Sequence, residues 1–333
     1  MGDWIVSADV LARSRFLVSP MHETVAAMTA LDRQFDAADR AFAALHREAY
    51  DAMLEAHPVR RELGQAAWRP RTPARAGWMA DFLGPAPSAP GMDIEAQLDE
   101  LAREWPDDRI RHEVQAVTAR PLPDALRRHG LTEELVGLLR WVWTATVEAD
   151  WPRRERVLHA DIVARTALLA TKGWASVIST LGRGRAWVGG GRITINGYDL
   201  PDRDLTGAQN LWFIPVHCAG AWVGWQPPER YALVYPVTGT GLAPASPEPG
   251  ALGRLLGDNR ARTLALLDGP RSTTHLVGLT GLPAASVSRH LHVLLESGLV
   301  QRRRSGREVL YWRSALGEGL VRAHHAQDSG TRT

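Results

Sequence analysis

The groups best suited to chemistry in this sequence lie on a stretch that reads as a helix from Pro283 to about Ser297. One face of this stretch is apolar, and the opposite face offers small residues followed by hydroxyl, guanidinium and imidazole groups. The candidates on that opposite face are Ala284, Ala285, Ser286, Ser288, Arg289 and His292. Such a face fits a DNA major groove roughly 12 Å wide, in which an arginine makes two hydrogen bonds to guanine. We expect Arg289 and Ser288 to read bases.

The elements that must position this face can be read from the residues around it. The apolar side of the stretch is formed by Val287, Leu291, Leu294 and Leu295, at the spacing of a buried helix face. A first helix is expected over residues 273–280, with Ser272 or Thr273 as its N-terminal cap. Residues 281–282 then turn the chain, and the proline that follows is expected in the first turn of the second helix.

A basic hairpin is expected directly after the second helix, over residues 299–313. Its two strand-like runs join around Ser305-Gly306, a pair suited to a tight turn. Arginines there would lie beside DNA phosphates and add affinity that depends on salt concentration rather than on base sequence. These candidates are Arg302, Arg303, Arg304 and Arg307. A solvated charged hairpin is the alternative, but the position after a helix-turn-helix favours a DNA-binding wing.

These segments together resemble the ArsR-type winged-helix repressors. The resemblance rests on Thr280-Gly281-Leu282, on Val287-Ser288-Arg289-His290-Leu291, on Gly298-Leu299-Val300 and on the run from Arg302 to Tyr311. It implies a C-terminal winged helix-turn-helix that binds DNA and represses transcription. It also implies that the flanking helices, here residues 252–267 and 316–321, form a dimer contact.

The same resemblance argues against metal sensing in this chain. Members of the family often bind metals through cysteines in the first helix of the motif or through histidines and acids in the terminal helix. The first helix here has no cysteine, and the terminal segment offers only His324-His325, which helical geometry points apart. Cys218 is the only cysteine, so one chain cannot build a thiolate-rich site. We expect no metal and no cofactor.

Length and charge indicate a second, larger part ahead of the DNA-binding region. A winged helix needs roughly 70 to 90 residues, whereas the chain has 333. Residues 251–333 carry twelve arginines against six acids, while the preceding 250 residues carry 27 basic and 31 acidic residues. The formal net charge of +2 therefore hides a basic DNA-binding region joined to a mildly acidic one.

The pattern along the chain predicts an α+β protein, in which a mainly helical N-terminal domain with a small β-sheet precedes the winged helix-turn-helix. Helices are expected from Ser7 to before Pro20 and over 23–31, 32–56, 94–105, 110–118 and, as two or three pieces, 132–181. Strands are expected over 4–6, 185–188, 191–196, 211–217, 221–224 and 231–235. The expected domains are 1–236, a linker over 237–250, the DNA-binding domain over 251–323 and a disordered tail over 324–333.

The N-terminal region resembles the long domain that precedes ArsR-type readers in regulators of high-GC bacteria. That resemblance rests on the segment from Leu11 to Thr24 and on Leu233-Val234-Tyr235-Pro236, and it implies no biochemical role. Three combinations invite a catalytic or metal reading, namely His22-Glu23, His112-Glu113 and His159-Ala160-Asp161. None has a second histidine four residues on, as a zinc-protease helix requires, so we expect no catalytic residues and no enzyme. An enzyme or protein-interaction module in residues 1–236, with the winged helix used for autoregulation or partner contact, is the alternative.

The partners follow from these expectations. The chain should bind double-stranded DNA as a homodimer on a pseudo-palindromic site, because two readers about 34 Å apart give specificity that one helix cannot. Twelve of the 13 tryptophans precede the linker, and those near the sheet, including Trp212 and Trp225, could line a pocket for a small-molecule effector or could be core. No secretory signal and no apolar run of about 18 residues is visible, so we expect a soluble, cytoplasmic protein without membrane contact.

Overall fold

The computed structural model describes residues 2–33, 37–69, 78–117, 121–182, 184–196, 201–218, 220–226, 228–237, 250–267, 271–305 and 308–321. The chain divides into two compact units, which are described separately below. The N-terminal unit comprises residues 1–151 and 165–237, and the C-terminal unit comprises residues 152–164 and 238–333. The linker expected over 237–250 lies outside the described residues except for its two ends, and the expected tail over 324–333 lies entirely outside them.

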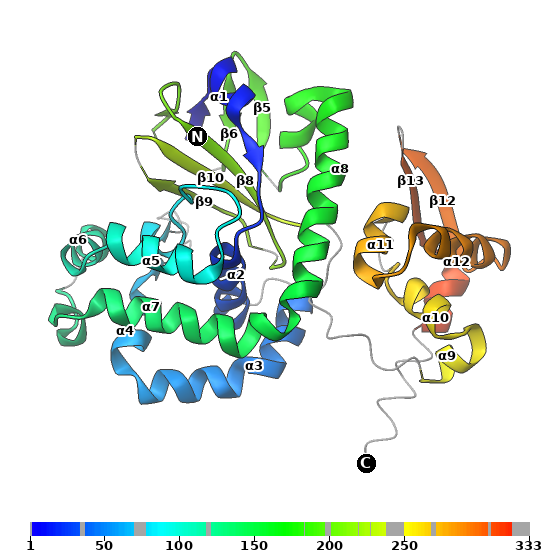
Figure 1. Cartoon of the computed structure of the whole chain (residues 1–333), viewed down its shortest axis with the longest axis horizontal. Coiled ribbons are helices and arrows are strands. Elements are labelled where there is room, and N and C mark those ends of the chain that lie inside the picture. The colour runs from blue at the N-terminus through cyan, green and yellow to red at the C-terminus, as the bar shows by residue number, and fades with distance from the viewer. Residues whose placement is uncertain are drawn as a thin grey trace. The chain divides into compact units, whose positions relative to one another are not determined.

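The N-terminal unit is built around one buried helix. This helix, α2 (Pro20–Arg33), has every residue from Pro20 to Leu31 buried, so packing surrounds it on all sides. Helices that follow it in the chain include α3 (Ala37–Ala56), α4 (Pro58–Ala66), α5 (Ile94–Glu104), α6 (Asp107–Val117), α7 (Leu131–Val142) and α8 (Trp151–Ile178) (Figure 1). Residues 152–164 of α8 are grouped with the C-terminal unit. Because α2 is buried throughout, the ionisable side chains near its start must find partners inside the protein.

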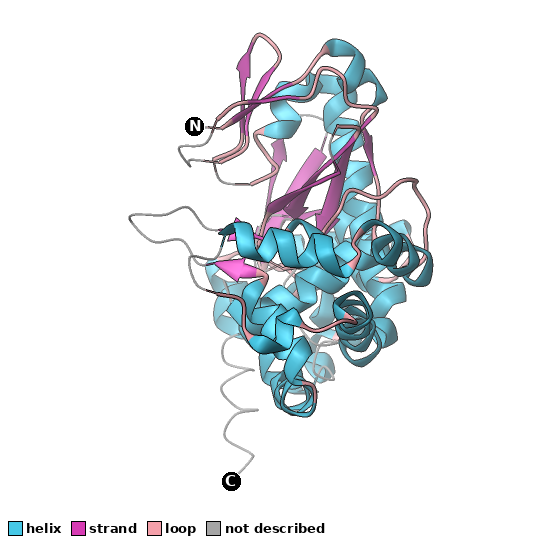
Figure 2. Cartoon of the chain, turned by 90° about the vertical axis from the view of Figure 1, so that its left-hand side faces the viewer, coloured by secondary structure: helices cyan, strands magenta, loops and turns pink. Residues whose placement is uncertain are grey.

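Two four-stranded sheets complete the unit (Figure 2). The first has the order β5 (Ala186–Gly189), β6 (Arg192–Thr194), β1 (Asp3–Ile5), β7 (Arg203–Asp204). The second has the order β2 (Arg15–Phe16), β8 (Asn210–Val216), β10 (Arg230–Pro236), β9 (Trp222–Gln226). Strands β8 and β10 pair in parallel and are buried along nearly their whole length, which explains their almost continuous apolar sequences. A short hairpin, β3 (Trp68–Arg69) with β4 (Trp78–Met79), lies apart from these sheets.

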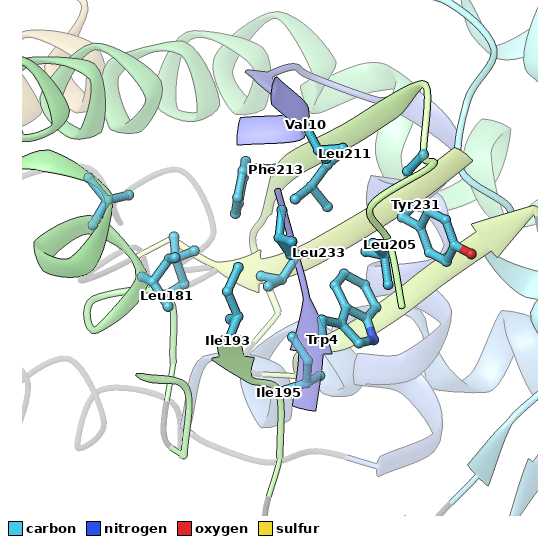
Figure 3. Packing of buried hydrophobic residues seen from close by; sticks show 14 of the residues in the cluster. Trp4, Val10, Leu181, Ile193, Ile195, Leu205, Leu211, Phe213, Tyr231 and Leu233 are labelled. Carbon is cyan, nitrogen blue, oxygen red and sulfur yellow. The ribbon is translucent and has the colours of Figure 1, made fainter. Parts of the chain in front are cut away.

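An apolar cluster joins the two sheets. Figure 3 shows Trp4 of β1 and Ile193 of β6 packing with Phe213 of β8 and Leu233 of β10. Leu181, which follows α8, belongs to the same buried cluster. Residues separated by more than 200 positions in the sequence therefore share one core.

Three sequence predictions for this unit need correction. The helix that begins after Ser7, α1 (Ala8–Arg13), ends at Arg13 rather than just before Pro20, because the next residues pair with β8 as strand β2. The expected single sheet is two sheets, since strands from the first 16 residues pair with strands near residues 190–216. Helix α4 was not predicted; Pro58 stands in its first turn, where a proline is tolerated.

The C-terminal unit has the order expected of a winged helix (Figure 1). Its helices are α9 (Gly250–Leu256), α10 (Asp258–Ala265), α11 (Thr273–Thr280) and α12 (Ala284–Glu296), and residues 315–321 are also helical. Its sheet has the order β11 (Arg271–Ser272), β13 (Glu308–Arg313), β12 (Val300–Ser305). Leucines and valines from all four helices, from β12 and from Val321 form one buried cluster. The predicted fold class, α+β with a C-terminal winged helix-turn-helix, is confirmed.

Among the described residues, no helix combines the length and the apolar character needed to span a membrane.

Candidate nucleic-acid interface

The turn between α11 and α12 is fixed by local chemistry. Ser272 caps α11, because its side chain accepts a hydrogen bond from the backbone N–H of His275. Gly281 ends the helix with φ of +70°, a left-handed conformation that favours glycine. Pro283 occupies the N-cap position immediately before α12 rather than the first turn of the helix as predicted, and it makes no side-chain capping hydrogen bond. These residues set the direction in which α12 leaves the turn.

The two faces of α12 lie as the sequence predicted. Val287, Leu291 and Leu294 are at most 1% exposed and pack into the core of the C-terminal unit, while Leu295 is half-buried against it. The exposed residues on the opposite side are Ala284, Ala285, Ser288, Arg289 and His292, with Ser286 half-buried at their edge. We call this side, from Ala284 to His292, the reading face.

Two charged neighbours of the reading face were not predicted. Nε2 of His292 lies 3.3 Å from Oε1 of Glu296, one turn further along α12, and both side chains are well exposed. Arg260 of α10 contributes a positive charge near His290, beside Arg289. Helical periodicity could have indicated the first pair, which is four residues apart, but gives no sign of the second.

The wing presents its arginines in alternation. Arg302, Arg303 and Arg304 are all exposed on β12 and stand opposite Tyr311, Leu310 and Val309 of β13. Successive side chains of a strand point to opposite faces, so Arg303 points away from the face shared by Arg302 and Arg304. Arg307 and Gly306 lie outside the described residues. The register therefore gives the wing positive charge on both of its faces.

A comparison with protein families agrees with this geometry. Residues 263–302 match the family described as bacterial regulatory protein, arsR family. The chain carries an ArsR-type helix-turn-helix. The matched segment runs from within α10 through α11 and α12 into β12. The match identifies the chain as a DNA-binding transcription regulator. Searches of curated proteins and of solved structures gave no significant match.

The N-terminal unit of this regulator holds the His22-Glu23 pair in separate buried contacts. Nδ1 of His22 lies 2.8 Å from Oγ of Ser19, which donates in turn to the side-chain oxygen of Gln97. Burial lowers the pKa of His22 to about 4. Oε2 of Glu23 accepts the backbone N–H of His217 at 3.1 Å, and its Oε1 lies 3.0 Å from Nδ1 of the same histidine. The second contact is a close approach of the two side chains that lacks the alignment of a hydrogen bond.

The other candidate pairs of the regulator are also split between environments. His112 and His159 are exposed, whereas Glu113 is half-buried and Asp161 is buried. Cys218 is buried, with its sulfur 3.9 Å from the carbonyl oxygen of Gly220. Within the described ranges, no three His, Cys, Asp or Glu side chains are grouped as ligands for a metal ion.

The tryptophans near the sheets make specific internal contacts. The indole N–H of Trp212, a side chain only 5% exposed, donates to the carbonyl oxygen of Pro87 at 2.8 Å. The indole N–H of Trp225 donates to the carboxylate of Asp81, and the guanidinium of Arg203 covers its ring at 3.8 Å from the ring centre. Trp212 is thus used for packing, while Trp225 stays half-buried at the edge of β9.

Glu113 is expected to make the stability of the N-terminal unit depend on pH. Burial, with the nearby negative charge of Asp81, raises the pKa of Glu113 to about 8. The folded state then keeps a proton that the unfolded state has lost above its ordinary pKa of 4.5, so stability falls as pH rises towards 8. We expect a loss of roughly 2 kcal/mol between pH 6 and pH 8.

Glu113→Gln should remove most of that loss. The variant keeps an oxygen that can accept the backbone N–H of Asp81, as Oε1 of Glu113 does now, and it cannot ionise. Urea denaturation at both pH values measures the effect, with the exposed Glu48→Gln as the control for charge alone. Equal pH dependence in wild type and Glu113→Gln would contradict the prediction.

Proposed function

We propose that this regulator is a homodimeric repressor that acts in the cytoplasm, with α12 in the DNA major groove and the wing on the phosphate backbone. The observation that carries the proposal is the division of α12 into a buried apolar face and an exposed face with small residues, Ser288 and Arg289. Small residues at the start of the helix let it approach the bases, and the longer polar side chains then reach them. The wing adds sequence-independent affinity.

Exposed leucines support the dimer. Leu255 is 68% exposed on α9 and Leu316 is 63% exposed in the helical segment 315–321, although the same segments bury Leu252 and Val321 in the core. These segments are the ones that the family resemblance assigned to dimer contact. Exposed apolar side chains on both flanking helices would be stabilised by burial against a second copy of the chain. Two copies related by a twofold axis would recognise a pseudo-palindromic site.

The N-terminal unit is proposed to act as an effector or partner domain and not as an enzyme. Its candidate catalytic residues are used in internal contacts, as the links of His22 to Ser19 and of Glu23 to His217 illustrate. Binding of an effector or partner to this unit would change the spacing of the two DNA-binding domains in the dimer. Effector binding would in this way be coupled to DNA affinity. Unchanged DNA affinity and unchanged regulation after deletion of residues 1–236 would refute this coupling.

Base reading and phosphate binding should separate by mutation. Arg289→Ala is expected to weaken base preference by roughly 1–3 kcal/mol, because it removes a two-bond contact to one base. Arg303→Ala should weaken all sequences alike and lower the slope of log affinity against log salt by about one. Affinities for the target site and for single-base variants, measured over a range of salt concentrations, test both statements. Equal effects of the two changes on every sequence would refute this division of roles.

The proposed function is tested by a genome-wide pull-down of DNA bound to the tagged protein in its own host. The control is the double variant Ser288→Ala/Arg289→Ala, which leaves the buried face of α12 intact. Sharp peaks that share an inverted repeat and disappear in the variant would support a dimeric regulator and identify its targets. No enrichment above the variant would favour an interaction or enzymatic role for residues 1–236.

A further inference from the structure

Arg260 lies on α10, the helix that packs against α12. The helices α10 and α12 pack against each other, and Arg260 is half-buried in the first turn of α10. Its guanidinium folds back toward Gly257, with Nη2 3.6 Å from the position that a Cβ would occupy on that glycine. On α12, half-buried His290 stands between exposed Arg289 and buried Leu291, so it marks the boundary between the reading face and the core.

Three basic side chains are close enough to influence one another electrostatically around this boundary. Burial and then the positive charges of Arg260 and Arg289 lower the pKa of His290, which places both guanidinium groups within electrostatic reach of the imidazole. In the part of the chain that the structure describes, neither Arg260 nor Arg289 forms an ion pair with a carboxylate. Like charges held together without an internal counter-ion repel one another, and a bound anion would relieve that repulsion.

We propose that Arg260 binds a backbone phosphate of DNA beside the groove that α12 enters, which makes α10 a third DNA-contacting element besides α12 and the wing. The inference rests on the proposed function, because it takes the reading face as the side turned toward DNA. A guanidinium matches the geometry of a phosphate and can donate two hydrogen bonds to it. From its place near His290, Arg260 would hold the start of α10 against the DNA strand while Arg289 points toward the bases. Arg260 is thus assigned a positioning role and Arg289 a reading role.

The experiment compares Arg260→Ala with Arg262→Ala in the full-length protein. Arg262 lies on the same helix and carries the same charge, but its guanidinium reaches the carbonyl oxygen of Leu279 within the unit, at 3.5 Å. We expect Arg260→Ala to weaken binding to the target site and to an unrelated duplex alike, to lower the salt slope by about one, and to leave base preference unchanged. Arg262→Ala should leave the salt slope unchanged. Arg260→Lys should keep most of the wild-type salt slope.

A second readout does not depend on affinity. The titration of His290, followed by NMR in the free protein, should move to higher pH in Arg260→Ala because a nearby positive charge is lost. Binding of DNA should also raise the pKa of His290 in the wild type, since a phosphate then lies close to the imidazole. Inorganic phosphate is the comparison: if it shifts His290 while Arg260→Ala leaves the DNA salt slope unchanged, the site binds free anions and the DNA assignment is wrong.

The outcomes separate this inference from the proposed function. If Arg303→Ala lowers the salt slope and Arg260→Ala does not, α12 and the wing still bind DNA but the role of α10 is refuted. Equal slope changes in Arg260→Ala and Arg262→Ala would refute it too, because they would reflect net charge alone. If the folded wild-type protein binds no DNA, the proposed function and this inference both fail.

Discussion

Replacing Glu23 with alanine is expected to lower the free energy of unfolding of the N-terminal unit by about 3–5 kcal/mol. The side chains of Glu23 and His217 are both 0% exposed, and they join the start of α2 to the end of β8. The carboxylate also accepts the backbone N–H of His217 at 3.1 Å. Its removal would leave that N–H and the imidazole buried without the carboxylate, and each such loss costs more than a surface hydrogen bond contributes. Domains are stable by only about 5–15 kcal/mol, so this change takes a large share of the total.

The controls for this prediction separate charge, hydrogen bonding and general perturbation. Glu23→Gln keeps an oxygen that can accept the N–H of His217 and replaces the other carboxylate oxygen with an amide NH2 group, so it should cost less than alanine. Glu48→Ala, at an exposed position of α3, should change the free energy of unfolding by less than about 0.5 kcal/mol. Combining Glu23→Ala with His217→Ala in a double-mutant cycle should show coupling of at least about 1 kcal/mol. Strict additivity of the two changes would mean that the pair does not hold α2 to β8.

The reading face could be predicted because its determinants are local. The cap at Ser272, the left-handed Gly281 and the three-to-four spacing of Val287, Leu291 and Leu294 all act within one or two turns of the chain. Local patterns also located strands β5, β6, β8, β9 and β10 to within two residues at each end. Whether the reading-face residues contact DNA is a separate question, and those assignments stay predictions.

The rest depends on contacts between distant parts of the chain, which no local pattern encodes. Strand β1 pairs with β6 across nearly 190 residues. Strand β2 was predicted as part of a helix, because its pairing with the distant strand β8 leaves no local pattern. The contact between Glu23 and His217 spans 194 positions. The electrostatic effect of Arg260 on His290 likewise requires α10 to pack on α12. Sequence patterns identified these residues as polar, and only the fold shows which of them meet.

Gly317→Ala is expected to destabilise the C-terminal unit by about 3 kcal/mol and to weaken DNA binding with it. A Cβ at Gly317 would overlap the carbonyl oxygen of Leu299 and lie 3.1 Å from its carbonyl carbon, so backbone rather than a flexible side chain would have to move. That carbonyl oxygen also accepts the N–H of Ser314 at 3.0 Å, which anchors the helical segment 315–321 beside the junction of α12 and β12. Moving the segment would disturb the core that supports the buried face of α12.

Gly319→Ala is the matched control for that change, because it makes the same substitution two residues along the same helical segment. A Cβ at Gly319 meets nothing within 4 Å, so alanine there should stabilise the helix by roughly 0.5–1 kcal/mol through lower chain entropy. Thermal unfolding and DNA affinity of both variants measure the difference. The oligomeric state adds a further test, since exposed Leu316 on this segment is assigned to the dimer contact and should lose its partner when the segment shifts. Equal stability of the two variants would mean that the segment is not packed against Leu299, and would remove the structural basis for placing the dimer contact there.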